Sequence, residues 1–149
     1  AVRMMAVFQY QPIGVEIDTL PDTYLCSAFG GSLRDSTQHF RNVERAFDAM
    51  LEGRVHAVMG TRAEIDHQLA RHADRPFRSA TNGFPGLVKQ SWDVGMAVKH
   101  THRELGHVIE AIVDRMVREG EIADIFARHG LRYSVPAYYD GILEMDEET

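Results

Sequence analysis

The fold is decided by residues 13–31, which read IGVEIDTLPDTYLCSAFGG. The apolar run at 13–17 contains three β-branched residues and predicts a strand. After Asp18 and Thr19 the apolar residues return at helical spacing, until the glycine pair 30–31 stops them. Residues 13–31 therefore predict a strand, a turn and a helix.

The same alternation continues further along the chain. Residues 39–43 are typical of a short strand, and Asn42 is placed to cap an amphipathic helix that follows. Residues 55–60 are a second run of strand type, and Thr61 is placed to cap the next helix. Strands and helices that alternate in this way predict an α/β fold, in which helices flank a mainly parallel sheet.

The second half of the chain carries the strongest helix pattern. Residues 74–91 predict a loop, and residues 92–99 predict a strand. A shorter helix, ended by Gly130, comes last. Between the strand and this short helix, one helix carries a continuous apolar stripe of Leu105, Val108, Ile109, Ile112, Val113, Met116 and Val117.

Composition excludes several classes of protein. The 149 residues, 44% of them hydrophobic, suffice for one packed domain. A net charge of -6 disfavours nucleic-acid binding, which needs a basic face. The apolar runs are too short to span a membrane, so we expect no membrane insertion. Four of the negative charges lie near the C-terminus, at Glu144, Asp146, Glu147 and Glu148.

One candidate binding site follows from the residues alone. Thr19 stands between the end of a strand and the start of a helix, where backbone N–H groups and the helix dipole favour an anion. The alternative is that Thr19 or Asp18 simply caps the helix. Asp18 also makes the position less hospitable to an anion, because its own carboxylate is negative.

The other residues that could serve as nucleophiles or metal ligands are better explained by structural roles. Cys26, the single cysteine, has apolar neighbours and no base near it in sequence, which favours a buried structural thiol over a nucleophile. The histidines at 100, 102 and 107 match no specific metal motif. Glu64, Asp66 and His67 read as solvated helix residues rather than half of a di-iron site. We expect no metal, no cofactor and no catalytic motif.

Three stretches carry a family resemblance. Residues 13–25 combine a strand, a threonine-containing turn and a helix, and residues 43–59 read VERAFDAMLEGRVHAVM. Residues 95–125 run from GMAVK through the striped helix to Gly120 and Ile125. In this order and spacing they resemble the bacterial periplasmic solute-binding proteins of type II, particularly the amino-acid-binding family.

The resemblance implies an incomplete two-lobed architecture. Such proteins have two α/β lobes joined by hinge strands. Residues 1–92 resemble the second lobe, residues 93–131 resemble the hinge strand and C-terminal helices, and residues 132–149 form an acidic tail. The first lobe is largely missing. The stripe from Leu105 to Val117 therefore needs an apolar partner, and we expect a homo-oligomer or a partner chain to cover it.

The resemblance also implies a ligand site at Asp18, Thr19 and Thr61. Thr19 matches the hydroxyl that holds a ligand carboxylate in relatives, and Asp18 replaces their usual glycine. Thr61 stands where relatives that bind amino acids carry an aspartate for the ammonium group. A neutral hydroxyl cannot replace that charge-assisted bond, which disfavours an ordinary amino acid as ligand.

Two functions follow from the resemblance, both in the periplasm. In the first, the chain binds a small polar or anionic solute that a membrane transporter takes up. In the alternative, it is a ligand-less accessory protein of a quinoprotein alcohol (methanol) dehydrogenase and acts by protein contact. Asp18, Thr61 and the missing lobe favour the second function, whereas the general abundance of solute-binding proteins favours the first. An enzyme is a third and weaker alternative, because a few dehydratases share the fold and would need a positioned acid such as Glu16 or Asp18 in a closed cleft. We expect no enzyme, because no pair of carboxylates is placed face to face.

Overall fold

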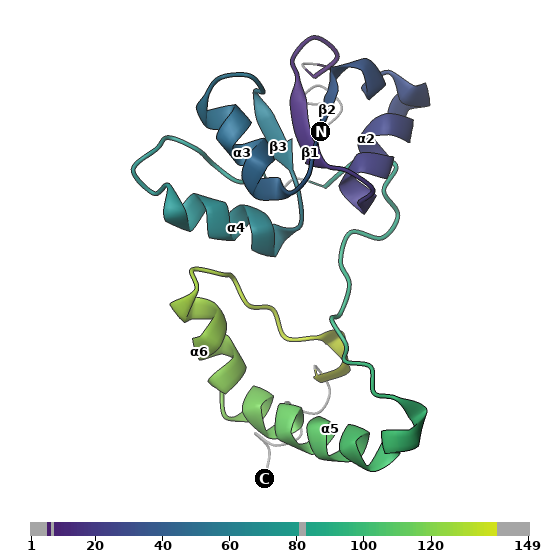
Figure 1. The fold of residues 1–149 in the computed structure, drawn as a ribbon. Coiled ribbons are helices and arrows are strands. Elements are labelled where there is room, and N and C mark those ends of the chain that lie inside the picture. The colour runs from purple at the N-terminus through teal and green to yellow at the C-terminus, as the bar shows by residue number, and fades with distance from the viewer. Residues whose placement is uncertain (1–5, 7, 81–82, 140–149) are drawn as a thin grey trace. The chain divides into compact units, whose positions relative to one another are not determined.

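The chain divides into two compact units, Ala1–Gln90 and Ser91–Thr149, close to the boundary expected after Trp92 (Figure 1). The computed structural model describes residue 6, residues 8–80 and residues 83–139. The acidic residues from Glu144 onward lie outside the described residues.

The first unit is built on a three-stranded parallel sheet in the order β2-β1-β3. Ile13 in the central strand stands opposite Thr37 on one side and Ala57 on the other. The expected α/β class with a parallel sheet is thereby confirmed. The strands are β1 (Ile13–Glu16), β2 (Thr37–Phe40) and β3 (Ala57–Met59).

Helices cover both faces of this sheet (Figure 1). Ile13 and Val15 are buried in one cluster with Tyr24 and Leu25 of the first helix. Gly14 has the opposite orientation, because side chains alternate along a strand, and it faces the second helix. The helices are α2 (Leu20–Gly31), α3 (Val43–Leu51) and α4 (Arg62–Arg71), with a short 3-10 helix, η1 (Arg34–Ser36), before β2.

Gly14 allows α3 to approach the central strand closely. A Cβ atom at Gly14 would lie 3.1 Å from the Phe40 ring and 3.2 Å from the Cβ of Ala46. Both distances are tighter than an ordinary van der Waals contact. The glycine in the fold-deciding stretch therefore serves the packing of strand against helix.

Local signals set the helix ends largely as expected. The Asn42 side chain accepts a hydrogen bond from the Arg45 backbone N–H at 2.9 Å, so the predicted cap of α3 is confirmed. The strand before it is Thr37–Phe40 rather than 39–43. In α2 the helical dihedral angles are lost from Ala28 to Gly30, so the glycine pair does lie where the helix stops.

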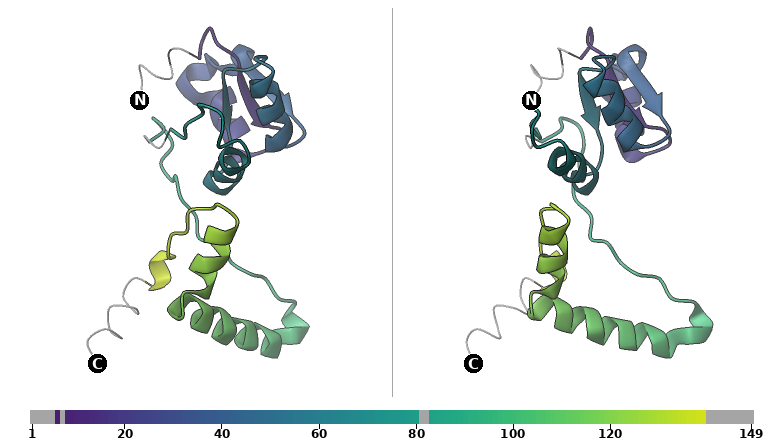
Figure 2. Two further views of the ribbon diagram at one scale, coloured as in Figure 1. Left: turned by 90° about the vertical axis from the view of Figure 1, so that its left-hand side faces the viewer. Right: turned by 60° about the vertical axis from the view of Figure 1, so that its left-hand side comes forward.

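The second unit contains two amphipathic helices, α5 (Arg103–Arg118) and α6 (Glu121–Arg128), preceded by the 3-10 helix η2 (His100–His102). Gly120 separates the two longer helices with a φ of +77°, and α6 turns away from the axis of α5 there (Figure 2). Both expected helices are confirmed. The chain after α6 packs back on it, because the rings of Phe126 and Tyr133 lie 5.1 Å apart.

The expected strand at residues 92–99 is wrong. These residues have no regular structure, and Val94 is 96% exposed. A strand needs a neighbour for its backbone hydrogen bonds, and within the described residues none pairs with this segment. Every second side chain of this segment is therefore apolar and exposed rather than buried, namely those of Trp92, Val94, Met96 and Val98.

The apolar stripe of α5 is also exposed. Leu105, Val108 and Ile112 are 50%, 54% and 44% exposed, and no residue of the helix is buried. Amphipathic helices normally bury such a face. None of the described helices has the length and apolar character needed to cross a membrane.

Candidate functional site

The carboxyl ends of β1 and β3 form a topological switch point. From β1 the chain turns to α2 on one face of the sheet, whereas from β3 it turns to α4, which packs on α3 at the other face. In open α/β sheets, ligands bind where two neighbouring connections diverge in this way. The structure places Asp18 and Thr19 in the first connection and Thr61 in the second.

Thr19 caps α2, as the alternative interpretation predicted. Its hydroxyl donates to the Glu16 carbonyl at 2.7 Å and accepts from the Asp22 backbone N–H at 3.4 Å. Asp18 has a φ of +60°, a conformation that aspartate tolerates better than most residues. The Asp18 backbone N–H donates to Asp22 Oδ2 at 2.9 Å, so this turn is held by its own hydrogen bonds.

Thr61 forms a complete capping box with Glu64. The Thr61 backbone N–H donates to Glu64 Oε2 at 2.8 Å, and the Glu64 backbone N–H donates to the Thr61 hydroxyl at 3.4 Å. The Thr61 hydroxyl also lies 2.7 Å from Glu64 Oε2. Both threonines of the expected site therefore have helix-capping partners.

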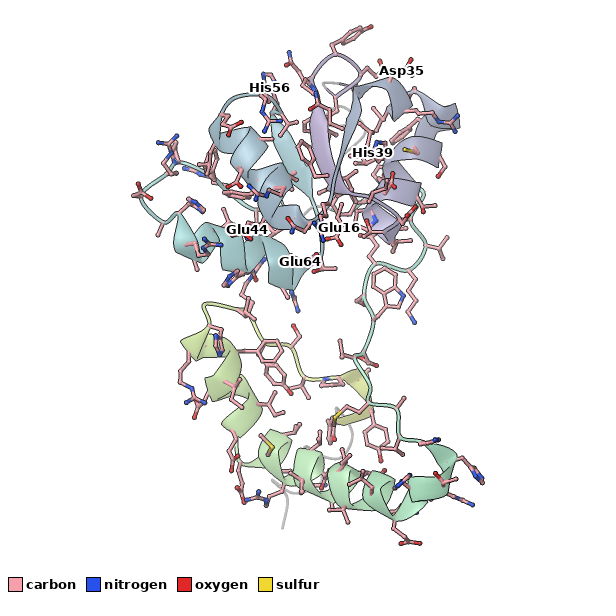
Figure 3. All side chains as sticks on the ribbon, viewed as in Figure 1. Glu16, Asp35, His39, Glu44, His56 and Glu64 are labelled. Atoms are coloured by element: carbon pink, nitrogen blue, oxygen red, sulfur yellow. The ribbon has the colours of Figure 1, made fainter. Side chains whose placement is uncertain are left out.

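Charged side chains of both signs lie along this edge of the sheet. Glu16 ends β1 and Glu64 lies in the first turn of α4, and both lie at the carboxyl end of the sheet, whereas Asp35 and His56 lie at the amino end (Figure 3). Asp18 adds a third, exposed carboxylate at the carboxyl end. Arg41, which follows β2, and Arg62, the first residue of α4, are cationic at the same end. The three carboxylates attract a cationic or hydrogen-bond-donating group, but they do not make the edge uniformly negative.

A second group of residues with potentially reactive or metal-binding side chains, Asp22, Cys26 and His39, lies beside this edge, on the face of the sheet that α2 covers. Asp22 Oδ1 accepts from the Cys26 thiol at 3.3 Å and lies 2.9 Å from His39 Nε2. The sulfur lies 3.8 Å from the same imidazole nitrogen. Sequence reasoning missed this group, because it treated Cys26 as a thiol without a base nearby.

The local sequence explains how the group forms. Asp22 and Cys26 are four residues apart on α2, which places them on one face of the helix. In the parallel register His39 stands opposite Val15, whose side chain packs beneath α2. His39 therefore points to the same face as Asp22 and Cys26. The spacing of Asp22 and Cys26 was visible in the sequence, but the register of β2 was not.

The pKa values of the two acidic groups of this cluster, the Asp22 carboxyl and the Cys26 thiol, shift in opposite directions. Burial raises the pKa of Asp22, but hydrogen bonds from the Asp18 backbone, Cys26 and His39 outweigh it and leave the pKa below its ordinary value. Burial raises the pKa of Cys26, as do the hydrogen bond to Asp22 and its negative charge. The Arg34 charge offsets only part of this rise. The Cys26 sulfur is therefore held as a thiol at neutral pH.

The other residues considered as metal ligands do not lie close together in the part of the chain that the structure describes. Among the residues that the structure describes, Asp22, Cys26 and His39 are the one group of three or more potential ligands within reach of a common ion. His100, His102 and His107 form no such group. Asp66 is only 7% exposed, so the expectation of a solvated side chain is wrong for this residue.

Two surface hollows among the described residues lie away from this edge. One lies on α6, and the other lies beside Tyr10 and Asp35, at the amino end of the strands. No family model, curated protein or solved structure matches this chain. The chemistry of the switch point and of the cluster beside it therefore rests on the residues themselves.

Proposed function

We propose that the first unit binds a small polar solute at the carboxyl edge of its sheet, as the second lobe of a periplasmic solute-binding protein does. The observation that carries the proposal is the switch point between β1 and β3, from which the Asp18–Thr19 and Gly60–Thr61 connections diverge. A single lobe supplies half of a binding cleft, so an enclosed pocket is not needed at this edge.

The carboxylates of the edge narrow the class of solute. Glu16, Asp18 and Glu64 contribute carboxylates, and the hydroxyls of Thr19 and Thr61 already have partners. A neutral or cationic polar solute with hydrogen-bond donors fits these groups better than an anion. The solute then reaches a membrane transporter from the periplasm, a partner and a location that come from the family resemblance alone.

Thermal unfolding of the full chain against a solute panel tests this proposal. The panel contains polyamines, amino acid amides, sugars and, as the opposing class, dicarboxylates. A solute that binds the native state raises the midpoint, by about 2.7 kcal/mol of stability when its concentration is a hundredfold above Kd. We expect a shift with a donor-rich solute. No shift from any member of the panel contradicts solute binding.

A second candidate function is favoured by the displayed face of α5. Leu105, Val108 and Ile112 are each about half exposed, and a stripe of this length is typical of a face that packs on another protein. A ligand-less accessory protein of a periplasmic quinoprotein dehydrogenase is such a case. Association with that dehydrogenase, measured by sedimentation in the absence of any solute, favours this function, whereas failure to associate counts against it.

A further inference from the structure

The cluster of Asp22, Cys26 and His39 has the dimensions of a metal site. The three potential ligand atoms are Asp22 Oδ1, Cys26 Sγ and His39 Nε2. Their separations are 2.9 Å from oxygen to nitrogen, 3.3 Å from oxygen to sulfur and 3.8 Å from sulfur to nitrogen. The three atoms thus form a small triangle on the surface of the first unit.

This triangle matches one face of a tetrahedron around Zn²⁺. Bonds of about 2.3 Å to sulfur and about 2.0–2.1 Å to nitrogen and oxygen, at tetrahedral angles, separate the ligand atoms by about 3.3–3.6 Å. Each observed separation lies within about half an ångström of that range. Small side-chain rotations therefore suffice to admit the ion.

The carboxylate is oriented by the backbone. Asp22 Oδ2 accepts from the Asp18 backbone N–H at 2.9 Å, which directs Oδ1 toward Cys26 and His39. Outer hydrogen bonds of this kind are typical of metal-binding carboxylates. The side chain of His39 is 40% exposed and that of Asp22 is 14% exposed, so an ion has access from solvent.

We propose that Asp22, Cys26 and His39 bind Zn²⁺ through one oxygen, one sulfur and one nitrogen, with the fourth position open to water. A mixed oxygen, nitrogen and sulfur donor set suits Zn²⁺ better than Mg²⁺ or Ca²⁺, which prefer oxygen ligands. Binding replaces the proton of the Cys26 thiol, and any proton on His39 Nε2, and releases it to solvent. No electron is transferred. This site adjoins the proposed solute edge, because Asp22 Oδ2 also accepts from the backbone N–H of Asp18.

The same geometry argues against a nucleophilic cysteine. In a catalytic triad the histidine uses one ring nitrogen for the nucleophile and the other for the carboxylate. Here a single atom, His39 Nε2, faces both Asp22 Oδ1 and Cys26 Sγ. Three groups whose ligand atoms face one point can bind one ion together. A proton relay instead needs the carboxylate, the imidazole and the thiol arranged one after another.

Cobalt spectroscopy of the full chain tests the site directly. Because Cys26 is the only cysteine, a thiolate-to-Co²⁺ charge-transfer band reports this residue alone. We expect the band, together with the intense visible bands of tetrahedral Co²⁺, to saturate at one ion per chain. Added Zn²⁺ should displace the cobalt. Folded wild-type protein without a thiolate band, or a band that saturates at one ion per two chains, overturns the proposal.

Single variants then identify the ligands. Cys26→Ser should abolish the band, and His39→Gln should weaken Zn²⁺ binding by more than about 100-fold, beyond the loss typical of an outer-shell partner. His56→Gln, on the opposite end of the sheet, is the matched control and should bind normally (Figure 3). Equal loss in the His56 and His39 variants overturns the assignment. If Cys26→Ser fails to fold, protection of wild-type Cys26 from alkylation by Zn²⁺ gives the same decision.

Discussion

Replacement of Thr19 by alanine measures how far the switch-point turn depends on its cap. The Thr19 hydroxyl makes one short hydrogen bond, to the Glu16 carbonyl at 2.7 Å, and one long one, to the Asp22 N–H at 3.4 Å. Loss of an N-cap hydroxyl costs about 0.5–2 kcal/mol, and the long bond favours the middle of that range. We therefore expect Thr19→Ala to destabilise the first unit by about 1 kcal/mol.

The assay is thermal unfolding followed by circular dichroism, without added solute or metal. For a unit of this size, 1 kcal/mol corresponds to a fall in Tm of about 4–8 °C. Thr19→Ser retains the hydroxyl and is the matched control, so it should unfold within about 2 °C of the wild type. An unchanged Tm for Thr19→Ala refutes the capping role, and so does an equal loss in the serine variant.

Four further predictions concern the core, the cluster and the displayed helix. Leu25→Ala should destabilise the first unit by about 2–5 kcal/mol in urea unfolding, because Leu25 is completely buried; a loss below about 1 kcal/mol contradicts the packing. With chelator present, Asp22→Asn should speed alkylation of Cys26 at pH 7, because removal of the carboxylate charge and hydrogen bond lowers the thiol pKa; unchanged kinetics contradict this. The folded pKa of Asp22 lies below its unfolded value of about 3.9, so its contribution to stability is full above that pH and is lost as pH falls through the folded pKa. Asp22→Asn should therefore flatten the loss of stability below about pH 4, and an identical acid profile argues otherwise. Val113→Asp should convert an oligomer into monomers in sedimentation, because it places a charge on the apolar stripe of α5; a wild type that is already monomeric contradicts self-association.

The sequence predicted the features that neighbouring residues determine. The strand that begins at Ile13 and the caps at Thr19, Asn42 and Thr61 each depend on a few adjacent residues, and the structure contains all four. Period-two alternation and capping hydroxyls are local signals of this kind. The parallel sheet followed from the order of these elements.

Features that need a distant partner were harder to predict. The strand expected at residues 92–99 failed because its alternation does not state which strand it pairs with, and none of the described residues supplies one. The cluster at Cys26 was missed for a related reason. Asp22 and Cys26 share a helix face, but His39 joins them only through the register that sets it opposite Val15.

A backbone-amide NMR titration of the full chain with the solute that shifts its Tm most tests the central claim directly. We expect the perturbed amides to cluster in residues 17–20 and 60–63, at the carboxyl ends of β1 and β3, while residues 34–37 and 54–56 at the opposite end stay unchanged. Perturbations confined to that opposite end, or no perturbation with any solute, would contradict a solute site at the switch point.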